Sequence, residues 1–178
     1  MRKLLFLGML LAVTWLSGCE SMSESECKIA DWGRVGSNDG ARGEPEGRLA
    51  DYTEDCGKTG VVPNARAYRE GWDIGIQRFC TASNGWREGL AGHSGKDQVC
   101  KGQAGYERFA RSLNAGLQVY RTNERIRSNT QEINRLQKKL EESKNDDEKR
   151  QIRHTMNNLD QDQFRLRSLL GQQQSLAP

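Results

Sequence analysis

The sequence predicts a mainly α-helical protein, in which a small, disulfide-braced, glycine-rich helical body is followed by a long antiparallel helical hairpin, or coiled coil. Three observations predict this class. Glycines recur mostly three or four residues apart between residues 33 and 92, four cysteines besides Cys19 lie between residues 27 and 100, and after residue 105 a three-four apolar stripe runs through charged and amide residues. Spacings of three and four residues favour helices over strands.

The first element is an export signal. Arg2 and Lys3 precede an apolar run over residues 4–15, and residues 16–18 lead to Cys19 through Ser and Gly. A charged start, a short apolar stretch and small residues before a cysteine are typical of bacterial lipoprotein signals. The run is shorter than the roughly 20 apolar residues that span a bilayer, so an ordinary signal peptide or a membrane-anchor helix is the weaker alternative. We therefore expect residues 1–18 to be removed and Cys19 to be acylated.

The mature chain is nearly neutral and its apolar content is small. The 178 residues carry a formal net charge of +3, and two of the positive charges, those of Arg2 and Lys3, are lost with the signal. Of the residues, 35% are hydrophobic. This length suits one compact domain with an appendage. Neither a basic footprint for nucleic acid nor an acidic tail is visible. We expect no nucleic-acid partner, and a small core that needs additional support.

Cysteines supply that support. Residues 19–26 are rich in Ser and Glu and are expected to form a lipidated flexible tether. Beyond them lie Cys27, Cys56, Cys80 and Cys100. An even number in an exported chain predicts disulfides, for which three connectivities are possible. A metal site is disfavoured because no CxxC pair occurs and His93 and His154 are the only imidazoles, and we expect no metal and no cofactor.

The glycine-rich body, expected over residues 27–105, contains a weak internal repeat. Residues 36–43 resemble residues 85–92, with glycines in register, Asp39 and Glu88 at equivalent places, and cysteines flanking each block. The repeat favours one disulfide inside each unit, Cys27 with Cys56 and Cys80 with Cys100. Glycine costs roughly 1 kcal/mol relative to alanine inside a helix, so this spacing indicates close helix-to-helix contact. Turns, or a groove for a glycan strand or a partner helix, are the alternatives.

A helix is expected between the two units, over residues 65–79, with Asn64 as its N-cap. Tyr68, Trp72, Ile76 and Phe79 fall near one face of this helix. Aromatic residues at such spacing are more typical of a core than of a ligand platform. We expect them to pack the interior of the body.

The second half, residues 106–171, is expected to form the hairpin, followed by a disordered tail over residues 172–178. Its arms of about 25 residues would be roughly 38 Å long. The first apolar stripe comprises Phe109, Leu113, Leu117, Tyr120, Ile126, Ile133, Leu136 and Leu140, and the second comprises Ile152, Met156, Leu159, Leu166, Leu169 and Leu170. Two helices that dimerise with another copy are the alternative to an intramolecular hairpin.

The break between the stripes, residues 143–148, sets the register of the hairpin. Asn145 can cap the second helix, with Glu148 at the third position of a capping box. Folding the chain about residue 145 places Ile126 near Phe164 and Tyr120 near Leu170, so the two apolar stripes meet.

Catalytic motifs are absent from the sequence. It contains no nucleophile elbow, P-loop, dinucleotide fingerprint or HExxH pattern. Carboxylates are numerous in the body, and surface or capping roles are more probable for them than the paired acid and base of a glycosidase. We expect a protein that is not an enzyme.

An ordered set of residues in the body resembles a family of bacterial lipoproteins catalogued as a domain of unknown function. The matching residues are Asp31, Trp32, Gly36, Asp39, Gly40, Gly43, Tyr52, Cys56, Gly60, Pro63, Tyr68, Gly71, Gly75, Cys80, Gly85, Gly89, Gly92 and Cys100. The resemblance covers about residues 27–100. The family often carries aspartate where Asn64 stands here, and either residue caps a helix. The resemblance implies an envelope location and brings no activity or catalytic residue.

Two functions are weighed. The first is a non-enzymatic lipoprotein of the bacterial envelope, anchored in the membrane by acylated Cys19 and facing the periplasm, whose hairpin contacts another envelope protein or a second copy. Because Glu20 is not aspartate, the anchor resembles the pattern for transfer to the outer membrane. The alternative is a small peptidoglycan- or glycan-binding or glycan-active domain. It would use Trp32, Trp72 or Trp86 to stack on sugars beside Asp39 or Glu88.

Overall fold

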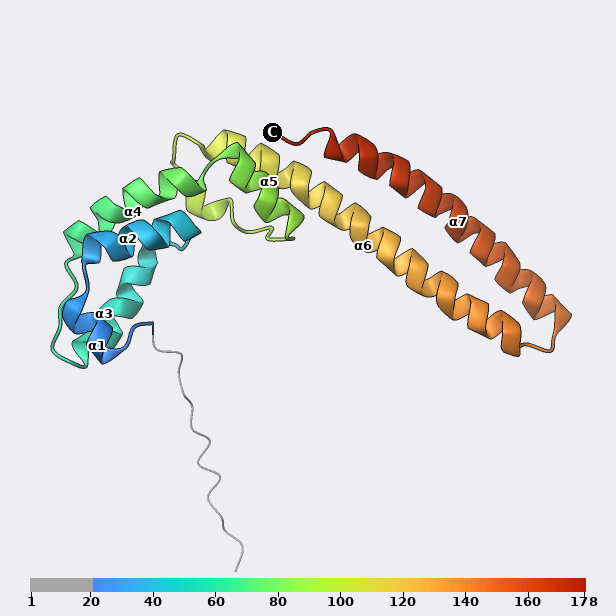
Figure 1. The fold of residues 1–178 in the computed structure, drawn as a ribbon, viewed down its shortest axis with the longest axis horizontal. Coiled ribbons are helices and arrows are strands. Elements are labelled where there is room, and N and C mark those ends of the chain that lie inside the picture. The colour runs from blue at the N-terminus through green and yellow to red at the C-terminus, as the bar shows by residue number, and fades with distance from the viewer. Residues whose placement is uncertain (1–20) are drawn as a thin grey trace, which may run out of the picture.

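The computed structural model describes residues 21–178, which fold into an arch of α-helices (Figure 1). Helices pack in successive pairs along the chain: α2 with α4, α5 with α6, and α6 with α7. The predicted class, a helical body followed by a long helical hairpin, is confirmed. The proposed signal and Cys19 lie outside the described residues.

Seven α-helices and two 3-10 turns make up this part of the chain. They are α1 (Glu24–Ile29), α2 (Trp32–Arg42), η1 (Glu46–Arg48), α3 (Leu49–Gly57), α4 (Ala65–Phe79), α5 (Ala82–Leu90), η2 (Gln98–Cys100), α6 (Tyr106–Glu142) and α7 (Asp146–Gln174). Side chains cap four of them. Asp31, Asn64, Thr81 and Asn145 each accept hydrogen bonds from backbone N–H groups in the first turn of the helix that follows.

Helices α2 and α4 pack backbone against backbone. A Cβ atom at Gly36 would lie 2.0 Å from the carbonyl oxygen of Tyr68, and one at Gly40 would lie 2.4 Å from that of Trp72. From the other helix, a Cβ at Gly71 would lie 1.9 Å from the carbonyl oxygen of Gly33. No side chain fits at these positions, so the glycine spacing seen in the sequence is the spacing of a helix contact.

Helices α5 and α6 repeat the same arrangement. A Cβ atom at Gly85 would lie 2.3 Å from the carbonyl oxygen of Phe109, and one at Gly89 would lie 2.3 Å from that of Leu113. Gly85 and Gly89 occupy the places that Gly36 and Gly40 occupy in the first pair. The internal repeat is therefore a repeated pair of helices, each held by glycines.

Each repeated unit ends in the same kind of turn. Gly43 follows α2 with φ 68°, and Gly92 follows α5 with φ 82°. Residues other than glycine rarely adopt these positive φ values. An aromatic ring covers each glycine closely, Phe79 over Gly43 and Tyr120 over Gly92. These rings stand at equivalent places in the second helix of each pair.

Two disulfides brace the body, one in each unit as predicted. Cys27 joins Cys56, with a Cα–Cα distance of 5.5 Å, and so ties α1 to α3. Cys80 joins Cys100, with a Cα–Cα distance of 5.6 Å, and ties the end of α4 to η2. All four cysteines are buried in one continuous core with the aromatic residues of α4, which supports the interior packing expected for that helix.

The predicted boundary at residue 105 falls inside the second helix pair. Helix α6 runs without interruption from Tyr106 to Glu142. Its first part packs on α5 through Phe109 and Leu113, and the remainder packs on α7. The glycine-rich body therefore extends into α6. Glycine is rare there because α6 contributes mostly the carbonyl groups against which the glycines of α5 pack.

The segment predicted to be a flexible tether is folded from residue 21 onward. The backbone N–H and the hydroxyl of Ser21 both donate to the Asp55 carboxylate at 2.8 Å, and Ser23 and Glu26 form the capping box of α1. Hydrogen bonds from Lys58 and then Ser21 lower the pKa of Asp55 to about 2. The Asp55 carboxylate is therefore ionised at neutral pH. The folded body begins at Ser21, two residues after Cys19.

The hairpin closes in the predicted register. Lys139 pairs with Glu148 at 2.9 Å near the turn, and Thr122 donates to Gln173 at 2.8 Å near the other end. Asn145 caps α7 as expected. The capping box is not formed as predicted, because the Glu148 carboxylate accepts from the Ser143 hydroxyl at 2.6 Å. Helix α7 continues to Gln174, so the tail predicted from residue 172 begins as helix.

One contact predicted for the hairpin is wrong. Phe164 does not face Ile126 but is 76% exposed, while the neighbouring Gln163 donates to the carbonyl oxygen of Ile126 at 3.3 Å and to Thr130 at 2.8 Å. The heptad positions of α7 explain the difference. Residues 152, 156, 159, 163, 166 and 170 alternate in steps of four and three, so position 163 faces α6 and position 164 faces away.

Candidate functional site

The most enclosed polar cluster of the body surrounds Asp39. Its side chain is 3% exposed, and Oδ2 accepts hydrogen bonds from the hydroxyls of Tyr52 and Tyr68, each at 2.9 Å. Arg48 Nε donates to the Tyr52 hydroxyl at 3.0 Å and lies 4.0 Å from the carboxylate. The cluster thus joins α2, α3 and α4 through one buried carboxylate.

Burial governs the chemistry of this cluster. Desolvation, followed by the hydrogen bond to Asp39, raises the pKa of Tyr68 far above its ordinary value. The same two causes raise the pKa of Tyr52. Both phenols therefore remain neutral donors at neutral pH, and the carboxylate they hold is closed to solvent. Such a cluster suits interlocking of helices better than proton transfer to a substrate.

The residues considered for glycan stacking are mostly interior. Trp32 is 8% exposed and Trp72 is 6% exposed, and Trp72 Nε1 donates to the carbonyl oxygen of Glu44 at 2.8 Å. Glu88 pairs with His93 at 2.8 Å, on the other helix pair from Asp39. The structure therefore does not bring the candidate tryptophans and acids together as a sugar platform; of the three tryptophans only Trp86 remains partly exposed.

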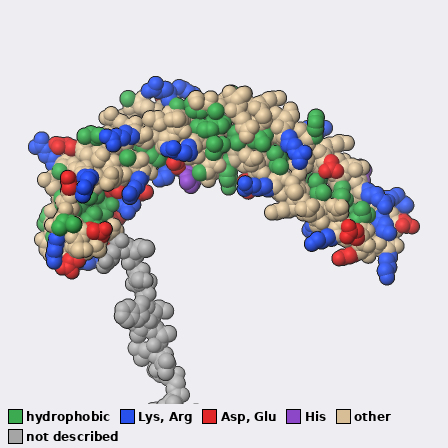
Figure 2. Space-filling view, viewed as in Figure 1, with side chains coloured by type: hydrophobic (Ala, Val, Ile, Leu, Met, Phe, Trp, Pro, Cys, Tyr) green, Lys and Arg blue, Asp and Glu red, His purple; other side chains and the backbone are tan. Residues whose placement is uncertain are grey.

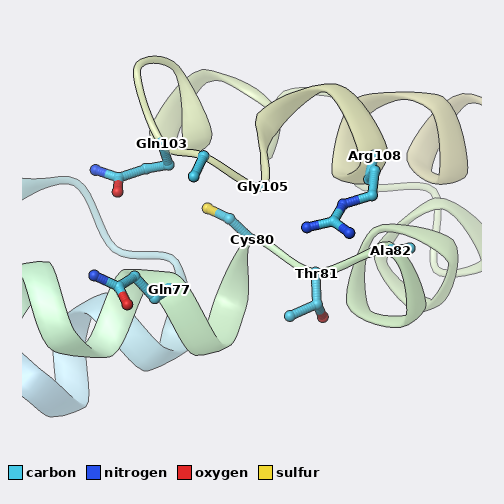
Figure 3. A pocket seen from close by; sticks show the side chains of 8 residues that line it. Gln77, Cys80, Thr81, Ala82, Gln103, Gly105 and Arg108 are labelled. Carbon is cyan, nitrogen blue, oxygen red and sulfur yellow. The ribbon is translucent and has the colours of Figure 1, made fainter.

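A cavity of about 510 Å³ lies where the two helix pairs meet (Figure 3). It is bounded by the end of α4, the turn into α5 and the start of α6, and its floor includes the buried Cys80 of the second disulfide. The lining residues are Gln77, Cys80, Thr81, Ala82, Gln103, Ala104, Gly105 and Arg108. The sequence could not reveal this cavity because two separate segments, residues 77–82 and 103–108, build it and neither carries a ligand-binding motif.

The cavity has a partly apolar lining to which one arginine and two side-chain amides contribute polar groups. In Figure 3 the guanidinium of Arg108 extends over the α4–α5 turn, close to Cys80 and Thr81. Within residues 21–178, Arg108 makes no ion pair, and the side-chain amides of Gln77 and Gln103 make no hydrogen bond. The cavity can therefore offer a cation and two amide groups to a ligand with carboxylate or carbonyl oxygens.

The outer face of α7 is the second candidate surface. Phe164 projects there, and Arg165 and Arg167 beside it form no ion pair within the described part of the chain. Elsewhere along the arch, charged side chains of both signs separate the apolar patches (Figure 2). An exposed aromatic ring, followed by two arginines at positions 165 and 167 that form no ion pair, distinguishes this position from the rest of the hairpin.

Residues 21–178 contain neither a helix that could span a membrane nor a group of metal ligands. No helix there combines the length and the apolar character needed to cross a bilayer. In the same range, no three His, Cys, Asp or Glu side chains gather as they would around a metal ion.

Comparison with known proteins identifies the body. Residues 31–118 match the family model described as "Protein of unknown function (DUF2799)". No curated protein and no solved structure matches the chain. The matched range contains both glycine-held helix pairs and the cavity at their junction, and it ends where α6 passes from α5 to α7. It also extends beyond the range of about residues 27–100 over which the family resemblance was expected. Residues 31–118 therefore form a domain that matches the DUF2799 family model, and the hairpin lies beyond the matched range.

Proposed function

We propose that the protein is a bacterial envelope lipoprotein, anchored through acylated Cys19 and acting without catalysis as an interaction module. The signal pattern before Cys19 supports the anchor. Two buried disulfides support an oxidising compartment, since such bonds rarely persist in the cytosol. Glu20 in place of aspartate favours the outer membrane, with the body facing the periplasm.

The observation that carries the interaction role is the exposed Phe164. The inward heptad positions of α7 are already engaged with α6, so this ring has no intramolecular role in the hairpin seam. Aromatic residues and arginine are enriched in protein interfaces, and Phe164 is flanked by Arg165 and Arg167. We propose that an envelope protein with an apolar pocket and an acidic rim receives this face. A second copy of the chain is the other partner considered.

The cavity at the junction supports a second candidate function. Its free Arg108 and two amides suit a carboxylate-bearing ligand such as the peptide of a peptidoglycan fragment. This replaces stacking on the tryptophans as the basis of the glycan-binding alternative, because Trp32 and Trp72 are buried.

Site-specific photo-crosslinking in intact cells tests both candidates. A photoreactive amino acid is placed at position 164, at the exposed position 151 of the same helix as a control about 20 Å away along the axis, or at position 103 in the cavity. One dominant protein captured from position 164 and not from 151 supports the proposed function. Equal capture from 164 and 151, or none, contradicts it. Peptidoglycan fragments captured only from position 103 favour the second candidate.

A further inference from the structure

We propose that the α1–α3 end of the body sits directly on the lipid bilayer, with Ile29 and Val62 in contact with it. This inference rests on the proposed acylation of Cys19. It differs from the usual picture of a lipoprotein domain held away from the membrane on a flexible stalk, and it fixes which end of the arch faces the lipid.

The first argument is the length of free chain. Ser21 is held to Asp55 by two hydrogen bonds, each 2.8 Å long, and Met22 packs against the core beside Cys56. Cys19 precedes Ser21 by two residues, and two residues of fully extended chain span about 7 Å. Acyl chains on Cys19 therefore bring the surface around Asp55 to the headgroups, whatever conformation residues 19 and 20 adopt.

The second argument is the position of the exposed aliphatic side chains. Ile29 is 82% exposed and Val62 is 83% exposed. Both lie in segments fixed to Cys56: α1 through the disulfide from Cys27, and the loop before α4 through a hydrogen bond from the Val61 N–H to the Cys56 carbonyl oxygen at 3.1 Å. The two side chains thus belong to the same end of the fold as Ser21, where a bilayer would cover them.

The charges at this end decide the kind of contact. Lys28 pairs with Glu24 and Lys58 pairs with Asp55, while Glu26, Asp51 and Glu54 add negative charge. Attraction to anionic lipid therefore does not hold this end on the membrane. The short tether and the aliphatic side chains do so, and the contact should form on zwitterionic lipid and withstand salt.

The arched shape of the molecule determines where the hairpin lies when the α1–α3 end contacts the bilayer. In Figure 1, α1 and α3 lie together at one end of the arch, and the turn between α6 and α7 lies at the other. With the first end on the lipid, the turn of the hairpin lies at the opposite end of the arch from the anchor. The contact therefore separates the anchored end of the molecule from the hairpin.

Fluorescence quenching in vesicles tests the proposal. The full chain is purified in its lipidated form and reconstituted into phosphatidylcholine vesicles with brominated acyl chains. An environment-sensitive fluorescent amino acid replaces Ile29 or Val62, or, as controls, the exposed Ile74 on α4 or Phe164 on α7. We expect the probes at 29 and 62 to lose at least half of their emission and to shift to shorter wavelength, while those at 74 and 164 remain as in water.

The outcomes separate this inference from the proposed function. Flotation of the protein with the vesicles and mass spectrometry of the Cys19 peptide establish acylation in the same sample. If the acylated protein floats and the probes at 29 and 62 are quenched no more than that at 74, the membrane contact is wrong and the anchor stands. If Cys19 carries no lipid, the proposed function and this inference both fail.

Discussion

At the scale of single residues, the body depends on one buried carboxylate. Asp39 is closed to solvent and receives the hydroxyls of Tyr52 and Tyr68, so three helices meet at a single side chain. A buried charge without partners is costly, and here two phenol donors and the nearby Arg48 satisfy it. The cluster therefore stabilises the fold only while both phenols stay protonated.

This requirement predicts a dependence on alkaline pH. The folded pKa values of Tyr52 and Tyr68 are raised above the unfolded value of about 10. The stability that they contribute is therefore fully present below pH 10 and is lost as the pH rises above it. Tyr68→Phe removes one donor from the buried carboxylate and should lower the free energy of unfolding by about 1–3 kcal/mol at pH 7.

Absorbance at 295 nm measures tyrosine ionisation directly. The chain has four tyrosines, and the signal from Tyr52 and Tyr68 should appear only well above pH 10, together with loss of helix. In Tyr68→Phe the part of this late signal that belongs to Tyr68 should vanish. Ionisation of all four tyrosines in one step near pH 10 would show that the cluster is open to solvent.

At the scale of elements, the glycine-held helix pair is the repeating unit of the body. Gly40 tests it because a Cβ atom there would lie 2.4 Å from a carbonyl oxygen of α4, whereas Gly171 in α7 has open space around it. Gly40→Ala should destabilise the protein by about 3 kcal/mol, since two backbones must separate. Gly171→Ala, the control, should be neutral or stabilise by up to about 1 kcal/mol.

Chemical denaturation of the two variants measures this difference. Gly89→Ala should behave like Gly40→Ala, because Gly89 holds the equivalent place in the second pair. Equal effects of Gly40→Ala and Gly171→Ala would mean that the close contact between α2 and α4 does not exist in solution.

The sequence reveals the elements better than it reveals their partners. Glycine spacing and cap residues predict the helical class and the turn at Asn145, because each is a local pattern. The repeat only favours one of three possible pairings of the cysteines, and the structure has that pairing. Folding the chain about residue 145 places Phe164 opposite Ile126, yet Gln163 occupies the heptad position that faces α6. The cavity beside Cys80 could not be predicted, since it exists only where residues 77–82 and 103–108 meet in the fold.

At the scale of the whole molecule, the chain consists of a braced body near its proposed anchor and an arm that leads away from it. The match to the family model ends at residue 118, within α6, and the same helix continues as the first helix of the hairpin. Because α6 is continuous, no flexible linker separates the body from the hairpin. The arm is thus carried by the body rather than tethered to it, which suits presentation of Phe164 at a defined distance from the membrane.

The anchor is the central claim, and mass spectrometry of the N-terminal peptide tests it most directly. The protein is expressed with its own N-terminus in a Gram-negative bacterium and extracted from the membrane fraction. We predict a chain that begins at Cys19 and carries a diacylglyceryl group and an N-linked acyl chain, and a Cys19→Ser variant that retains its signal or leaves the membrane fraction. A wild-type chain that retains Met1, or that carries Cys19 without lipid, would contradict the account.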